Sequence, residues 1–127
     1  MIEAIVFPDA VELVCDHLRT QLSPTPVVSR VPTTRPAAFV KVTRVGGVRR
    51  NLVTDEPTLT VEAWAATEQA AHDLSQLARA HIYAMPGDGD VYRVTEFSGP
   101  ALLPDPLSDQ PRFSFTVAVA TGFASTA

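Results

Sequence analysis

The segment from residue 58 to residue 85 most constrains the fold, because a strand pattern passes almost directly into a helix pattern. Residues 58–64 alternate and predict a β-strand with one apolar face, formed by Leu59, Val61 and Ala63. From Glu68 onward apolar residues recur three and four positions apart, at Ala70, Ala71, Leu74, Leu77, Ala78, Ile82 and Met85. This spacing gives one continuous stripe and predicts an amphipathic helix.

The ends and the composition of this helix indicate what it covers. The Thr67 hydroxyl can accept a hydrogen bond from the first turn and so acts as N-cap, and Pro86-Gly87 ends the helix. Three positions of its apolar stripe are alanines, which let the helix axis lie close to its neighbour. We therefore expect the helix to pack on a sheet.

Length and cysteine content bound the kind of protein. A chain of 127 residues is long enough for one domain, 1–127, that buries a sizeable core. The single cysteine, Cys15, excludes an intrachain disulfide, and nothing argues for an oxidising compartment. No stretch approaches ~20 apolar residues, so we expect no membrane segment and a soluble, unsecreted protein.

The rest of the chain alternates between short predicted elements. Asp9 and Glu12 form a capping box that begins a helix, whose buried stripe comprises Val11, Val14, Cys15, Leu18 and Leu22. The predicted strands cover residues 27–31, as an edge strand, and 37–45, 48–54, 91–97 and 112–120. Gly46-Gly47 supplies a turn or bulge. A loop covers 98–111, and a frayed tail begins at about residue 122.

This order of elements predicts an α+β protein. We expect an antiparallel or mixed sheet of four to five strands with two helices packed on one face. The last strand places Phe113, Phe115, Val117 and Val119 inward and small, weakly polar residues outward. The second face of the sheet is therefore predicted to be semi-polar and available to a partner.

Charge is unevenly distributed along the chain. The net charge is −4, but residues 30–50 contain six basic residues and no acid: Arg30, Arg35, Lys41, Arg44, Arg49 and Arg50. Four basic residues against 14 acids remain elsewhere, a net charge of −10. We expect a basic side, which suits an anionic ligand, nucleic acid or an acidic protein surface. An ordinary solvated, arginine-rich hairpin explains the same pattern.

No motif indicates catalysis, a cofactor or a metal. Cys15, Asp16 and His17 are adjacent, and adjacent side chains on a helix point apart. Asp88 and Asp90 lack the further carboxylates of a calcium loop. The nine aromatic residues do not interleave with the basic ones as a nucleic-acid stacking surface requires. We therefore predict a protein that is not an enzyme and has no cofactor-binding, catalytic or metal-ligating residues.

Three segments carry a family resemblance. They are 7–12, which opens the first helix, 59–64, which leads into the alanine-rich helix, and 109–115, where a proline-aspartate loop meets an arginine-aromatic strand. Together with the order of elements they resemble the tail terminator proteins of long-tailed, non-contractile bacteriophages.

This resemblance implies a structural role in the virion. Tail terminators are small α+β subunits that form a homohexameric ring on the head-proximal end of the tail tube, stop its polymerisation and join it to the head. The implied partners are further copies of the chain, the major tail tube protein and the head-tail connector or head-completion protein. DNA would pass through the ring without specific binding, and no membrane is involved. The implied location is the virion tail, with assembly in the host cytoplasm.

Two groups of residues are candidate contacts in such an assembly. The first is the basic set of residues 30–50, of which Arg44, Arg49 and Arg50 are expected at a hairpin tip. The second is the set of loop leucines Leu102, Leu103 and Leu107, which we expect to lie on an apolar surface, either the chain's own core or a neighbour, in a loop that becomes ordered on assembly. Two other functions remain open: another neck component, such as a head-completion or connector-adaptor protein, and a small ligand-binding regulatory domain.

Overall fold

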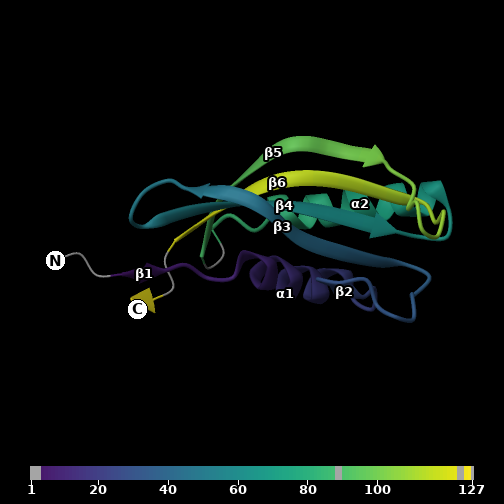
Figure 1. The fold of residues 1–127 in the computed structure, drawn as a ribbon, viewed down its shortest axis with the longest axis horizontal. Helices are drawn as coiled ribbons and strands as arrows, with labels where there is room; N and C mark the ends of the chain where they lie inside the picture. Colours follow the sequence, from purple (N-terminus) through teal and green to yellow (C-terminus); the bar gives the residue numbers. More distant parts are fainter. Residues whose placement is uncertain (1–3, 88–89, 123–124, 127) are drawn as a thin grey trace.

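The computed structural model describes residues 4–87, 90–122 and 125–126 of the chain. Its elements are β1 (Ile5–Val6), α1 (Ala10–Leu22), β2 (Val27–Val28), β3 (Phe39–Arg49), β4 (Thr54–Trp64), α2 (Glu68–Tyr83), β5 (Val91–Leu102), β6 (Arg112–Gly122) and β7 (Ser125–Thr126). Five strands form one sheet in the order β2-β3-β4-β6-β5, and β1 pairs with β7 (Figure 1). Only β2 runs parallel to its neighbour, so the sheet is mixed. The predicted α+β class is confirmed.

Both helices begin where the sequence predicts. The Asp9 carboxylate accepts a hydrogen bond from the Glu12 backbone N–H at 3.2 Å, and the Thr67 hydroxyl accepts one from Ala70 at 3.1 Å. These side chains satisfy backbone donors that have no partner inside the helix. The Glu12 carboxylate lies 3.3 Å from the Arg19 guanidinium, an ion pair within α1.

The core lies between the two helices and one face of the sheet. Alternate residues of the central strands are buried against residues of α1 and α2, and these include Leu59, Val61, Ala63, Phe115, Val117, Val119, Val14, Leu18, Ala78 and Ile82. Full burial of each large aliphatic side chain contributes about 1.5–3 kcal/mol. The helices also touch each other, where the His17 ring Nε2 lies 3.0 Å from the His81 carbonyl. Both helices therefore cover the same face of the sheet.

The buried stripe of α2 differs from the predicted one. Ala70 and Leu77 are exposed, and the buried positions are Ala71, Ser75, Ala78 and Ile82. This set is spaced four, three and four residues apart, so it also satisfies the helical period. The sequence prediction was wrong at Ala70 and Leu77 because it followed hydrophobicity and passed over a buried serine.

The hairpin between β3 and β4 is longer than predicted. β3 continues through Gly46-Gly47 as a bulge, marked by a register shift between Arg44 and Gly46, and the chain turns at 50–53 instead. The return strand is β4 itself, so the separate strand predicted over 48–54 does not form. Pro57 is tolerated in β4 because the pairing of β4 with β6 passes from Thr58 to Asp55 without it.

Three further boundaries differ from the prediction. β5 runs to Leu102 and includes Pro100, which an edge strand accepts because its outer N–H groups need no partner within the sheet. β2 is an edge strand, as predicted, but covers only Val27–Val28. The tail expected to fray from about residue 122 contains the last residue of β6 and the strand β7; residues 123, 124 and 127 lie outside the described residues.

Substitutions at the two hairpin glycines test the bulge. Gly47 has φ = +120°, and a Cβ there would lie 2.5 Å from the Glu56 carbonyl oxygen and 2.6 Å from Pro57 Cα. Gly46 has φ = +144° but open space around its Cβ position. We expect Gly46→Ala to cost about 1–3 kcal/mol through backbone strain alone, and Gly47→Ala to cost more. Urea unfolding measures both; equal losses would contradict the close backbone approach at Gly47.

Candidate interaction surfaces

Four of the six basic residues in segment 30–50 lie beside carboxylates of the same subunit. The closest nitrogen–oxygen distances are 2.6 Å for Arg35–Asp105, 3.8 Å for Lys41–Glu62, 3.6 Å for Arg44–Asp55 and 2.8 Å for Arg50–Glu56. Arg30 is exposed just after β2. The acids come from later parts of the chain, which the local charge count did not include. Much of the expected basic side is therefore neutralised at close range.

Two arginines fix the hairpin turn. Arg49 donates from Nε to the Asn51 carbonyl at 3.1 Å and from Nη2 to the Leu52 carbonyl at 3.0 Å, and its guanidinium lies over the Phe7 ring. Arg50 donates from Nε to the buried Glu56 carboxylate at 2.8 Å. Its hydrogen bond to Glu56 is the main reason that the pKa of Glu56 is lowered. Arg49 and Arg50 lie near the hairpin tip, as predicted, but their donors are directed inward.

The side chains that the hairpin exposes are apolar. We call the hairpin tip the set of four large apolar residues whose exposed fractions lie between 46% and 56%: Val45, Val48, Leu52 and Val53. Val45 and Val48 lie at the end of β3, and Leu52 and Val53 lie in the turn, which is closed by the Asn51 side chain that accepts from the Val53 N–H at 2.9 Å. Sequence reasoning missed this set because it assigned residues 48–54 to a strand. The available signal was four apolar residues within nine positions around Gly46-Gly47.

A second exposed apolar surface lies on α2. We call the α2 groove the residues Gln76, Leu77, Arg79, Ala80 and Tyr83. Four of them line a surface depression of about 470 Å³, and the exposed Leu77 lies next to it on the helix. Arg79 forms a two-point ion pair with Glu96 of β5 at 2.6 and 2.7 Å. Because that pair holds the guanidinium against β5, the depression is lined mainly by apolar atoms.

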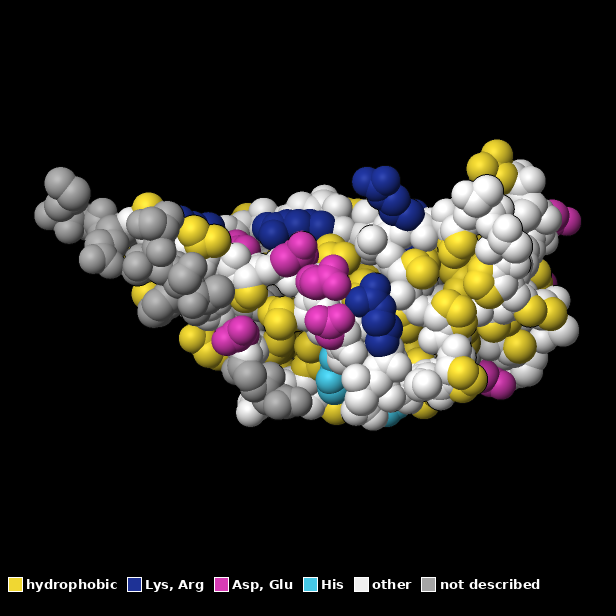
Figure 2. Space-filling model, turned by 90° about the horizontal axis from the view of Figure 1, so that it is seen from below, with side chains coloured by type: hydrophobic (Ala, Val, Ile, Leu, Met, Phe, Trp, Pro, Cys, Tyr) yellow, Lys and Arg dark blue, Asp and Glu magenta, His cyan; other side chains and the backbone are white. Residues whose placement is uncertain are grey.

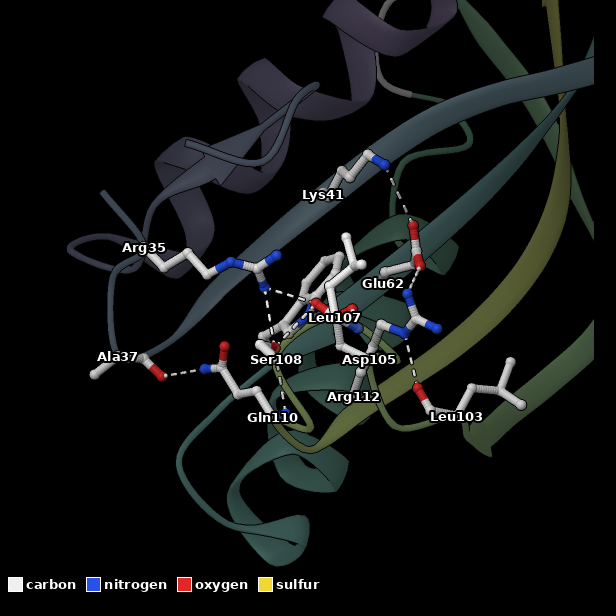
Figure 3. A network of polar contacts seen from close by, with 11 residues as sticks. Arg35, Ala37, Lys41, Glu62, Leu103, Asp105, Leu107, Ser108, Gln110 and Arg112 are labelled. Atoms are coloured by element: carbon white, nitrogen blue, oxygen red, sulfur yellow. Dashed lines mark hydrogen bonds and ion pairs between the residues drawn. The ribbon is translucent and has the colours of Figure 1, made fainter. Parts of the chain in front are cut away.

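Asp105 anchors the loop between β5 and β6 (Figure 3). Its buried carboxylate accepts from Arg35 Nη1 at 2.6 Å, Trp64 Nε1 at 3.2 Å, Ser108 Oγ at 3.1 Å and the Leu107 N–H at 3.0 Å. The Leu107 N–H, followed by Arg35, holds the pKa of Asp105 well below its usual range. One carboxylate therefore joins the loop to β4 and to the segment before β3.

At the same end of the sheet, three charged side chains from neighbouring strands form a row of ion pairs (Figure 3). Glu62 of β4 lies between Lys41 of β3 and Arg112 of β6, at 3.8 and 3.0 Å. The Arg112 guanidinium lies 5.5 Å from the Trp64 ring centroid and donates from Nε to the Leu103 carbonyl at 2.7 Å. These contacts lie on the face of the sheet opposite the helices, because strand residues alternate between faces. Lys41 is thus part of an internal network.

The three candidate leucines are all exposed, so they do not pack on the core of their own subunit; contact with a neighbouring molecule stays a prediction. Leu102 ends β5, Leu103 follows it, and Leu107 is 89% exposed on the loop. The loop backbone is held from within: Asp109 donates to the Asp105 carbonyl at 2.7 Å, and Leu103 donates to the Arg112 carbonyl at 2.8 Å. These contacts favour a loop that is already ordered in the free subunit. Ordering on assembly stays a hypothesis that hydrogen exchange can test.

The side chains considered for catalysis or metal binding form no site among the described residues. Burial raises the pKa of the Cys15 thiol to about 11, which disfavours the reactive thiolate. Figure 2 shows acidic side chains gathered over α1 with basic side chains beside them, and Glu12 and Asp16 of this helix pair with Arg19. Among residues 4–87, 90–122 and 125–126, no three His, Cys, Asp or Glu side chains gather as a metal site requires.

Hydrogen exchange distinguishes a preformed loop from one that orders on assembly. In the free subunit we expect slow exchange of the Leu107 amide, because it donates to the Asp105 carboxylate. Asp105→Ala should accelerate exchange at Leu107. The Leu103 amide, bonded to Arg112, serves as the internal control and should change little. Fast exchange at Leu107 that becomes slow only in assembled tails would instead support ordering on assembly.

Acid unfolding tests the role of Asp105. Because its pKa is lowered in the folded chain, the charged carboxylate stabilises the fold above its unfolded pKa of about 3.9, and this contribution is lost as pH falls further. We expect Asp105→Asn to cost about 1–3 kcal/mol at pH 7, with a gap to wild type that shrinks below about pH 4. Fluorescence of Trp64, the single tryptophan, measures unfolding.

The matched control for this measurement is Asp109→Asn, because Asp109 lies exposed in the same loop. It should remain close to wild type in stability at every pH. A gap between Asp105→Asn and wild type that stays constant from pH 7 to pH 3 would contradict the assignment.

Comparison with known proteins places the chain in a family. Neither helix among the described residues is long and apolar enough to span a membrane. A search of curated proteins gives no match. A family model described as phage tail termination protein matches residues 6–124 of the 127. Because this match includes both helices and the five strands of the main sheet, the chain belongs to the family of phage tail termination proteins.

Proposed function

We propose that this protein caps the head-proximal end of the phage tail tube as a homohexameric ring, ends tube polymerisation and presents the surface that joins the head. The observation that carries the proposal is the family match over residues 6–124. Membership of this family favours a structural role over catalysis and a location in the virion tail. The partners in this proposal are the major tail tube protein on one side and the connector or head-completion protein on the other.

The arrangement of surfaces supports a ring. The hairpin tip and the α2 groove differ in shape and belong to different layers of the fold. Contacts between two unlike surfaces join subunits head to tail, and such contacts close into a ring when the rotation permits. The face of the sheet opposite α1 and α2 adds a third surface for the tube or the head.

In this proposal, the basic residues of segment 30–50 contribute mainly through long-range electrostatic attraction to a partner. Arg44 and Arg50 are bound to Asp55 and Glu56, so a direct bridge to a partner would break an existing pair. Their exposed guanidinium groups still contribute to the field that orients an approaching acidic partner. With most of these charges paired and an overall charge of −4, DNA passes through the ring without specific binding.

Electron microscopy of particles assembled without this chain tests the proposal. We expect overlong, headless tails of irregular length, because nothing would end tube polymerisation. Supplying the chain in trans should restore tails of uniform length. Tails of normal length that lack heads would assign the chain to the head side of the neck, and normal virions would overturn a role in the neck altogether.

A further inference from the structure

We infer that the hairpin tip of one copy binds the α2 groove of the next copy, through apolar contacts instead of arginine bridges. The inference rests on the proposed ring and assigns its subunit contact. It starts from the observation that exposed apolar residues gather in these two places, although the arginines beside both are already paired within the subunit.

Hydrogen bonds within the subunit hold the hairpin tip in one conformation before it binds a partner. Its turn is fixed by Arg49, which binds the Asn51 and Leu52 carbonyls, and its base by Arg50 and Arg93, which both bind Glu56. The hairpin reaches past the beginning of β5 in Figure 1, and its four apolar residues are exposed. A turn that is rigid before binding loses little conformational entropy on docking.

The α2 groove is apolar and large enough to receive side chains of the hairpin tip. Gln76, Leu77, Ala80 and Tyr83 recur at helical spacing on the exposed side of α2, with the small Ala80 lining the depression. A depression of about 470 Å³ admits the side chains of a hairpin turn, since ligand pockets span ~300–1,000 Å³. Because Arg79 is held by Glu96, an inserted leucine meets the stem of Arg79 instead of a free charge.

Charge favours a second copy of this chain as the occupant. Segment 44–56, which holds the hairpin together with the two carboxylates that pair with it, carries three arginines against two acids, a net charge of +1. Helix α2 carries Glu68 and Asp73 against Arg79, a net charge of −1. Opposite charges around two apolar surfaces steer a head-to-tail encounter and disfavour contact between like surfaces.

Self-association of matched variants tests the contact. We expect Leu52→Asp to weaken ring formation by about tenfold or more in analytical ultracentrifugation, because a buried apolar anchor would become charged. Ala80→Arg, which fills the groove, should have the same effect. The control is Phe97→Asp, which places the same charge on an exposed apolar residue of β5 outside both surfaces and should leave the ring intact. A ring weakened by Phe97→Asp and not by Leu52→Asp would overturn the inference.

Cysteine crosslinking tests which surfaces meet. On mild oxidation of assembled tails that contain both single variants, we expect a disulfide between Leu52→Cys of one copy and Ala80→Cys of another. Cys15 is buried and does not compete, and Phe97→Cys paired with Ala80→Cys is the negative control. A ring without the Leu52–Ala80 crosslink overturns this contact but leaves the proposed function standing. Crosslinking of Leu52→Cys to the tube protein also overturns it, whereas tails without any ring overturn the proposed function itself.

Discussion

The structure depends on the two-sided constraint on β4, which pairs with β3 on one edge and β6 on the other. Its residues alternate, so Leu59, Val61 and Ala63 are buried beneath the helices while Thr60, Glu62 and Trp64 point to the opposite face. No helix covers that face in the part of the chain that the structure describes, and these three side chains of β4 find partners on neighbouring strands or a loop. Thr60 lies 3.3 Å from Thr116, Glu62 binds Arg112, and Trp64 donates to Asp105.

This constraint also changes the meaning of the basic segment. Along the chain, residues 30–50 form a cluster of positive charge. In the fold, β3 and β4 run antiparallel, and this pairing places carboxylates of β4 beside several of these basic side chains. Asp55, Glu56 and Glu62 neutralise three of the basic side chains, and Asp105 from the last loop neutralises Arg35. These ion pairs therefore hold the hairpin and the last loop in place. The side chains that the hairpin exposes to its surroundings are apolar.

In a phage tail termination protein, separate roles for the paired charges and the exposed apolar residues have a physical advantage. Ion pairs inside the subunit fix the turn and the loop, so the proposed docking would order few side chains. In the proposed ring contact, apolar residues supply the contact area, and opposite charges of the hairpin and α2 guide orientation. An arginine that already bonds two carbonyls, as Arg49 does, contributes more to the shape of the tip than to recognition by its charge.

The sequence by itself determined the two helices and their caps at Asp9 and Thr67, the alternation of the central strands and the α+β class, because these follow from local periodicity and short-range hydrogen bonds. Even there, the buried Ser75 and exposed Leu77 escaped a hydrophobicity pattern. Only the tertiary structure decided the long β3–β4 hairpin, the pairing of Arg35 with Asp105 and the exposure of the hairpin tip. Those features depend on contacts between distant residues, whose energies local sequence does not encode: a bulge at Gly46-Gly47 is favoured over a turn only because β4 continues to pair beyond it.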